Sequence, residues 1–143
     1  MSAPDKNLAK RVVDKMMHDD AFSKWLGVEV LDVQDGAATV RMKVRAEMLN
    51  GFKVCHGGIP FSLADSALAF AANTNGNITM SVENNIGYPK AVLEGDVLTA
   101  QAKQLSSSRR IAHYTVDVKR ADGELVAIFR GTVYRTEKEH FPQ

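Results

Sequence analysis

The segment NGFKVCHGGIPFSLADSALAFAAN, residues 50–73, joins two adjacent glycines to a long run of alanine, leucine and phenylalanine. The part from Ile59 to Asn73 consists mostly of residues that favour a helix. Apolar side chains surround nearly its whole circumference, which is typical of a helix buried on most sides. Pro60 suits its first turn, because proline has no N–H to lose there. The segment therefore predicts a central, buried helix.

The sequence on both sides of this helix alternates between apolar and polar residues, as strands with one buried face do. Before the helix, strands are expected over residues 28–33 and 38–45, joined by the hairpin signal Asp35-Gly36. After it, four more are expected over residues 78–88, 97–105, 111–121 and 124–136. Their connections are too short for parallel crossovers. One mostly antiparallel sheet of about six strands must therefore cover the helix, which makes the fold class α+β.

The two ends of the chain complete a single domain over residues 1–143. Apolar residues three and four positions apart predict an amphipathic N-terminal helix over about residues 5–26. Residues 137–143 follow the last strand and are expected to form a frayed tail.

Composition and charge exclude several classes of function. Eighteen Lys and Arg against seventeen Asp and Glu leave a net charge of +1, so no basic face for nucleic acid is expected. No segment approaches the roughly 18 apolar residues of a membrane span, and charges interrupt the first twenty residues where a signal peptide would lie. The single cysteine, Cys55, fits a reducing compartment. A cytoplasmic protein without membrane or nucleic-acid partners is therefore predicted.

Gly57 and Gly58 stand where the central helix begins. N–H groups at a helix start have no partner within the helix and point outward with the positive end of the helix dipole. Such groups can stabilise an oxyanion as it develops during a reaction. The alternative is that the two glycines only form a tight turn.

Asp65 is the one charged residue between Ile59 and Asn73, and no Lys or Arg lies within four positions of it. A charge on a mostly buried helix is costly unless it is satisfied, and aspartate is a poor helix former away from the caps. A catalytic function could compensate for that cost. The alternative is a narrow solvated stripe formed by Ser62, Asp65, Ser66 and Asn73.

Other reactive residues are weaker candidates. Cys55 and His56 are neighbours in an extended segment and point in opposite directions, which argues against a Cys/His nucleophile pair. The histidines, at positions 18, 56, 113 and 140, have no acidic or cysteine partner at metal-ligand spacing, so no metal is predicted. The cluster Ser106-Ser107-Ser108-Arg109-Arg110 is either a solvated turn or a place where hydroxyl and guanidinium groups bind phosphate.

Five short motifs carry a resemblance to a known family. They are Ala46-Glu47-Met48-Leu49-Asn50-Gly51, Cys55-His56-Gly57-Gly58, Phe61-Ser62-Leu63-Ala64-Asp65, Ala69-Phe70-Ala71-Ala72-Asn73 and Val126-Ala127-Ile128-Phe129-Arg130-Gly131. Together they resemble the signature of the hotdog-fold acyl-CoA thioesterases, most of all the phenylacetyl-CoA thioesterases of bacterial phenylacetate degradation. The resemblance covers almost the whole chain.

The resemblance implies a hotdog fold, in which a curved antiparallel sheet wraps one long helix. It also implies hydrolysis of an acyl-CoA thioester, phenylacetyl-CoA or a hydroxylated arylacetyl-CoA, to the free acid and coenzyme A. Asp65 would act as general base or nucleophile, the Gly57 N–H would polarise the thioester carbonyl, and Asn50 would position substrate or water.

The same resemblance implies how the substrate is held and how the protein assembles. His56 and Gly58 would shape the substrate loop, and Arg109 and Arg110 would contact the coenzyme A nucleotide. No cofactor is implied, because coenzyme A is part of the substrate. Such proteins build the active site between two subunits, commonly in a homotetramer made as a dimer of dimers.

Two rival functions remain open on the sequence. A hotdog hydratase or dehydratase would need an acid/base pair at the acyl chain, and His56 with Asp65 is the only available pair. A non-catalytic acyl-CoA-binding regulator would need a DNA-binding module, and residues 1–26 are too short and not basic enough to supply one. The His-Gly-Gly pattern followed by Asp65 favours the thioesterase.

Overall fold

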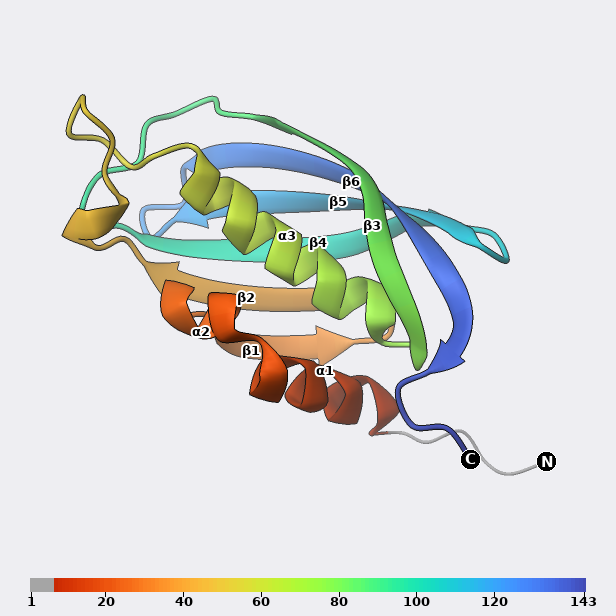
Figure 1. Ribbon diagram of the computed structural model, residues 1–143. Coiled ribbons are helices and arrows are strands. Elements are labelled where there is room, and N and C mark those ends of the chain that lie inside the picture. Colours follow the sequence, from red (N-terminus) through yellow and green to blue (C-terminus); the bar gives the residue numbers. More distant parts are fainter. Residues whose placement is uncertain (1–6) are drawn as a thin grey trace.

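An antiparallel sheet curves around one long helix in the computed structural model, which describes residues 7–143 (Figure 1). The helix is α3 (Gly58–Asn73). The strands are β1 (Glu29–Gln34), β2 (Ala37–Lys43), β3 (Asn77–Gly87), β4 (Val97–Ser107), β5 (Ile111–Arg120) and β6 (Leu125–Glu139). They follow the order β1-β2-β4-β5-β6-β3, and each neighbouring pair is antiparallel. For these residues, the predicted α+β arrangement of one helix wrapped by six strands is confirmed.

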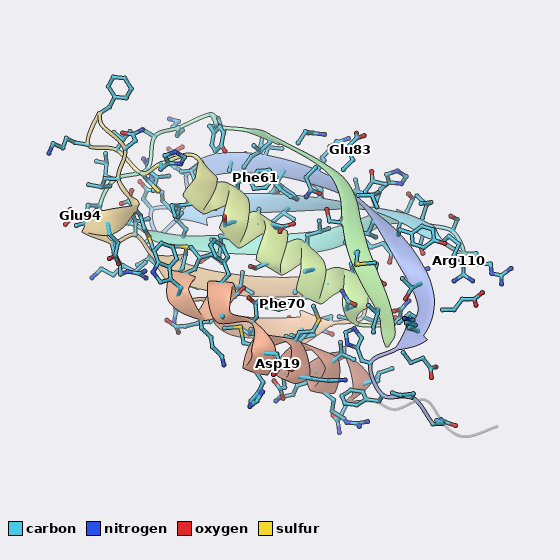
Figure 2. The ribbon with its side chains drawn as sticks, viewed as in Figure 1. Asp19, Phe61, Phe70, Glu83, Glu94 and Arg110 are labelled. Carbon is cyan, nitrogen blue, oxygen red and sulfur yellow. The ribbon has the colours of Figure 1, made fainter. Side chains whose placement is uncertain are left out.

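The core lies between α3 and the inner face of the sheet. Leu63, Leu68 and Phe70 of α3 are fully buried, as the apolar circumference of the helix predicts. The ring of Phe61, labelled in Figure 2, lies at the N-terminal end of α3. It packs edge-to-face on Phe129 of β6, with ring centroids 5.3 Å apart. Inner-facing side chains of β2, β4 and β5 alternate with exposed ones and complete the core: Val40, Met42, Leu98, Ala100, Val116 and Val118. This packing fixes the faces that α3 presents.

The predicted N-terminal helix is confirmed, but it is divided into two helices, so the prediction of one continuous helix over about residues 5–26 is wrong. These are α1 (Leu8–Asp19) and α2 (Ala21–Leu26); residues 5 and 6 lie outside the described range. Asp20 leaves the helical conformation, with φ −92° and ψ 86°, and its side chain accepts a hydrogen bond from the Ser23 N–H at 2.9 Å. An aspartate in that geometry caps a new helix, so the chain changes direction here although the apolar spacing continues.

The C-terminal segment is ordered by pairing, so the predicted frayed tail from residue 137 is also wrong. β6 continues to Glu139, which pairs with Asn77 of β3. Beyond the strand, the His140 N–H donates to the Gly76 carbonyl at 2.9 Å, and the Phe141 ring lies under the Arg11 guanidinium, 4.4 Å from ring centroid to Cζ. The tail therefore closes the C-terminal end of α3. The remaining strand ends differ from the predicted ones by only a few residues.

The two edges of the sheet are covered differently. β1 packs against α1, whereas β3 has no neighbouring strand on its outer side among the described residues. Met80 and Val82 of β3 are 57% and 61% exposed. An uncovered edge strand offers unpaired backbone groups that can bind another strand.

Candidate active site

The loop before α3 is shaped by Asn50. Its side-chain Oδ1 accepts hydrogen bonds from the backbone N–H groups of Phe52 at 2.9 Å and Val54 at 3.4 Å. Its own N–H donates to the Val54 carbonyl at 2.8 Å, and Lys53 adopts the left-handed region with φ 66°. Within residues 7–143 the Asn50 Nδ2 has no acceptor. The turn is therefore closed by one end of this amide, while the other end keeps a donor for a ligand.

His56 and the two glycines form the start of α3. The Gly58 N–H donates to His56 Nδ1 at 2.9 Å, so the neutral imidazole carries its proton on Nε2. The Ile59 N–H donates to the His56 carbonyl at 2.9 Å, and the Phe61 N–H donates to the Gly57 carbonyl at 3.3 Å. Among the N–H groups of this helix start, only that of Gly57 has no acceptor in the described chain. The dipole of α3 acts in the same direction as this donor.

Tyr88, directly after β3, covers Gly57 from outside. Its hydroxyl donates to the Gly57 carbonyl at 2.7 Å, and a Cβ at position 57 would lie 3.2 Å from the ring. The φ of Gly57 is −58°, an ordinary helical value. Glycine at this position therefore serves the close approach of Tyr88 rather than an unusual backbone conformation. No local pattern in the sequence connects Tyr88 with Gly57, so this contact could not be predicted.

Asp65 lies half-buried on α3. Its Oδ1 accepts a hydrogen bond from Asn84 Nδ2 of β3 at 3.3 Å, and no described residue donates to its Oδ2. Burial raises the pKa of the carboxyl above its usual range, the Asn84 hydrogen bond lowers the pKa, and the charge of Asp20 raises it again. A partly desolvated carboxylate with one open oxygen can act as a base or a nucleophile.

Gly57, directly before α3, and Asp65 within α3 are not brought together. Eight residues separate them, which is about 12 Å along an α-helix axis. The carbon and the oxygen of one carbonyl group are bonded to each other, so a single thioester cannot meet both groups of the same chain. The two predicted catalytic groups of one chain are therefore about two helical turns apart.

The polar stripe on α3 is not a solvated surface, so that alternative is wrong for two of its four members. Ser66 is buried and shares a 2.8 Å hydrogen bond with the Ser23 hydroxyl of α2. Ser23 in turn donates to Asp20 Oδ2 at 2.6 Å. Asn73 is only 1% exposed. These contacts attach α2 and the C-terminal tail to α3.

Arg109 and Arg110 lie at the tip of the β4–β5 hairpin, at the far end of the sheet from the loop before α3 (Figure 2). The side chain of Arg109 is 84% exposed, and its Nη2 lies 3.9 Å from Glu137 Oε1. The side chain of Arg110 is 27% exposed; it forms an ion pair with Glu137 and donates to the Arg135 carbonyl at 3.2 Å. The two arginines therefore differ in how freely they can bind a ligand.

The remaining candidates can be placed as well. Cys55 is buried, and burial together with the charge of Asp96 raises the pKa of its thiol to about 11, so it is not a thiolate at neutral pH. Within residues 7–143, no three His, Cys, Asp or Glu side chains gather where they could hold a metal ion. In the same range, every helix is too short or too polar to cross a bilayer.

Comparison with known proteins agrees with this fold. Residues 52–127 match the family model described as Thioesterase superfamily. The chain is 37% identical over 120 residues to the acyl-coenzyme A thioesterase PaaI of Escherichia coli, covering 84% of this chain and 86% of that protein. It is 40% identical to a putative esterase of Archaeoglobus fulgidus over 141 residues, 99% of this chain and 91% of the relative.

Solved structures give the same result. The PaaI protein from the phenylacetic acid degradation operon of E. coli superimposes with a TM-score of 0.91 at 34% identity, over 94% of this chain and 97% of the other. A hypothetical thioesterase of Streptococcus pneumoniae, solved with coenzyme A, superimposes with a TM-score of 0.81 at 28% identity, over 87% and 98% of the two chains.

The fold and these matches define a hotdog protein with thioester hydrolase activity. The chain belongs to the Thioesterase superfamily.

Proposed function

We propose that this protein hydrolyses acyl-CoA thioesters in the cytoplasm, with phenylacetyl-CoA or a hydroxylated arylacetyl-CoA as substrate. The observation that carries the proposal is the pair formed by the half-buried Asp65 carboxylate, with its open Oδ2, and the unpaired Gly57 N–H. Thioester hydrolysis needs a carboxylate near the carbonyl carbon and a donor aimed at the oxygen as it gains charge. The resemblance to an acyl-coenzyme A thioesterase supports the substrate class.

The reaction replaces one bond to the acyl carbon by another. Oxygen from water ends on the acyl carbon, the C–S bond breaks, and the sulfur of coenzyme A leaves as a thiolate that takes up the proton released from water. Asp65 either removes a proton from the attacking water or attacks the carbon itself, forming an anhydride that water then opens. In both routes the Gly57 N–H stabilises the oxyanion, and the Asn50 Nδ2 positions substrate or water.

The site is completed by a second copy of the chain. Because about 12 Å of helix separates Gly57 from Asp65, the Gly57 of one copy acts with the Asp65 of its partner on the same thioester. The uncovered β3 edge, with Met80 and Val82 exposed, offers a surface where two copies can extend one sheet. Two such dimers form the homotetramer.

Coenzyme A binds on the side of the sheet where Asp65 lies. Asn84, next to Asp65, pairs with Gly131, and Gly131 pairs with Tyr114 of β5. From Tyr114 the strand runs back to Ile111 at the hairpin tip, about 10 Å away at the rise of a strand. Arg109, the more exposed of the two hairpin arginines, meets the phosphates, and Arg110 supports it. At the other end of the substrate, His56 and Gly58 hold the loop around the carbonyl.

An aromatic acyl group suits the apolar residues near the loop. Phe61 packs on Phe129 at the start of α3, while Met48 and Leu49 line the loop before it. A flat ring can pack edge-on against phenylalanine, which contributes about 0.5–1.5 kcal/mol beyond simple burial. The related E. coli protein comes from a phenylacetic acid degradation operon, which supports a role in phenylacetate catabolism.

The test of the activity is release of free thiol from a panel of CoA thioesters. Phenylacetyl-CoA and its hydroxylated analogues are expected to show about tenfold or greater kcat/KM relative to acetyl-CoA and palmitoyl-CoA, the discrimination an apolar pocket supplies. A best substrate with a long alkyl chain would refute the aryl specificity. A change in enoyl absorbance without thiol release would favour a hydratase, and binding without turnover would favour a sensor.

The test of the shared site is complementation between two inactive variants. Gly57→Pro removes the N–H while keeping φ near −58°, the value that proline prefers. Gly57→Ala is the matched control, because it adds a similar Cβ contact with Tyr88 but retains the N–H. Each chain is co-expressed with Asp65→Asn under a different tag, and mixed oligomers are purified through both tags.

A mixed dimer of Gly57→Pro and Asp65→Asn chains keeps one intact site, made from the Gly57 of one chain and the Asp65 of the other. About half of the wild-type activity is expected to return in such dimers. Mixed oligomers as inactive as the two parents would show that each site lies within one chain. Light scattering of the wild type measures the assembly, and an active monomer would refute the shared site.

A further inference from the structure

A second polar residue, Asn84, lies next to Asp65 although it comes from a distant part of the chain. Asn84 lies on β3, opposite Gly131 of β6 in the sheet register. Its Nδ2 donates to Asp65 Oδ1 at 3.3 Å, and its own Oδ1 accepts a hydrogen bond from the Ser81 hydroxyl at 2.9 Å. An ionised carboxylate only accepts hydrogen bonds, so the amide must turn its nitrogen toward Asp65. Ser81 holds the amide in that orientation.

The space for this contact is provided by Gly131. A Cβ at position 131 would lie 2.6 Å from the Asn84 Oδ1 and 2.6 Å from Cδ2 of Leu68 on α3, closer than carbon and oxygen atoms pack. Any side chain at position 131 would therefore push Asn84 or Leu68 away. The three residues belong to β6, β3 and α3, and together they bring the amide to the helix face that carries Asp65.

We propose that Asn84 is a positioning residue for the thioester hydrolysis: it binds Asp65 Oδ1, fixes the rotation of the carboxylate and leaves Oδ2 directed at the thioester or the attacking water. The inference rests on the proposed function of Asp65. An acid or base works only when its reacting atom is held in the productive geometry. A carboxylate bound through one oxygen keeps the lone pairs of the other oxygen for chemistry.

Asn84 also contributes to the pH range in which Asp65 is ionised. Burial raises the pKa of the carboxyl, the Asn84 hydrogen bond lowers the pKa, and the charge of Asp20 at the start of α2 raises it. The other groups around Asp65 do not compete. Asp65 is the only charged residue of α3. Glu83 of β3 pairs with Thr132 at a register position that faces away from α3. Tyr114, on the inner face of β5, donates its hydroxyl to Gln104. Removing the amide donor must therefore raise the pKa of Asp65 further.

The test uses two substitutions of Asn84 and one matched control. Asn84→Ala removes the donor, and Asn84→Asp keeps the shape but places a second carboxylate beside Asp65. Asn85→Ala is the control, since Asn85 is adjacent on the same strand but exposed, and pairs with Arg130. Thermal unfolding and light scattering establish that each variant folds and assembles as the wild type does. The kcat, the KM and the pH profile of kcat/KM are then measured with one CoA thioester.

Asn84→Ala is expected to lower kcat about tenfold at neutral pH with little change in KM. Activity falls as Asp65 becomes protonated, so the acidic limb of the profile moves to higher pH in Asn84→Ala and further in Asn84→Asp. Asn85→Ala keeps the wild-type profile. A residue with only a structural role would not move the limb in a folded variant.

The outcomes separate this inference from the proposed function. Wild-type kcat and an unchanged acidic limb in folded Asn84→Ala and Asn84→Asp would overturn the positioning role, while an inactive Asp65→Asn enzyme would leave the function of Asp65 standing. An active Asp65→Asn enzyme would overturn both. An acidic limb that moves equally in Asn85→Ala would also overturn the inference, because the effect would then come from the strand as a whole.

Discussion

Asp65 and Asn73 lie on the same helix, eight residues apart, but their polar side chains differ in exposure and in the number of hydrogen bonds they make. Asn73 is 1% exposed and makes four hydrogen bonds within the part of the chain that the structure describes: its Nδ2 donates to the Ala69 and Thr79 carbonyls, and its Oδ1 accepts from the Thr79 N–H and bonds the His140 ring. Asp65 is more exposed and accepts a single side-chain hydrogen bond at 3.3 Å within the described residues.

The difference separates a structural polar group from a functional one. A buried amide that is fully hydrogen-bonded stabilises one arrangement of the chain, because any shift would leave several groups unpaired. It joins α3 to β3 and to the C-terminal tail. A carboxylate with an open oxygen costs stability but keeps capacity for a ligand. Substitutions at the two positions should therefore affect different measurements.

The largest expected effect is on turnover. Asp65→Asn keeps the shape of the side chain but removes the charge needed by a base or nucleophile, so kcat should fall by about 10² or more. Steady-state thiol release measures the loss, with circular dichroism as a check on folding. If kcat stayed near that of the wild type, the carboxylate would not be the catalytic group, and the difference between Asp65 and Asn73 would have no bearing on function.

The converse substitution, Asn73→Ala, should affect stability and not chemistry. It leaves the Thr79 N–H and the His140 ring without their shared acceptor, and an unsatisfied buried group costs about 1–3 kcal/mol. A loss of about 2–3 kcal/mol in the free energy of unfolding is expected, measured by urea denaturation. The control is Asn75→Ala, because Asn75 is exposed and, among residues 7–143, its side chain accepts only from the Asn77 N–H. A comparable loss in both variants would contradict the structural role of Asn73.

The two hairpin arginines also differ in how many of their hydrogen-bonding groups are already paired, and the expected effects are smaller. Arg109→Ala should raise KM for a CoA thioester about tenfold, within the range of one charge-assisted contact, and leave KM for a truncated pantetheine thioester unchanged. Arg110→Ala should change KM less, because Arg110 is already paired with Glu137 and the Arg135 carbonyl. Equal effects on the two substrates would place the nucleotide elsewhere.

The smallest expected effect is a pH-dependent gain in stability. The pKa of Asp65 is raised by burial, so its contribution to stability is present when it is protonated and is lost as pH rises through the raised pKa. Asp65→Asn should therefore have a higher Tm than the wild type at about pH 7.5, with a difference that shrinks toward about pH 4.5. A difference that grew on acidification would show that the folded state lowers the pKa instead.

Several features of the site could be predicted because their signals are local. An apolar helix requires neither adjacent glycines at its start nor a charged residue within it, as found at Gly57, Gly58 and Asp65. Each of these departures can be recognised from a few neighbouring residues. The break at Asp20 also carries a local signal, since an aspartate three residues before Ser23 is a typical helix cap. The apolar spacing continues across Asp20, however, and that spacing alone predicts one continuous helix.

Other features could not be predicted because they depend on pairing between distant residues. The strand β6 extends through charged residues to Glu139, which pairs with Asn77 of β3. The contact of Tyr88 with Gly57 and that of Asn84 with Asp65 each connect β3, or the residue after it, to α3. Strand register decides these contacts, and register depends on the packing of whole faces.

By itself the sequence determined the buried helix, the antiparallel strands around it and the presence of an uncompensated Asp65, because burial and alternation are properties of neighbouring residues. Only the tertiary structure decided that, among the described residues, Asn73 is fully hydrogen-bonded while Asp65 keeps an open oxygen, and that Asn84 of β3 lies beside Asp65. The physical reason is that hydrogen bonds and distances between elements arise when the helix and the strands pack, and a pattern within one element carries no measure of them.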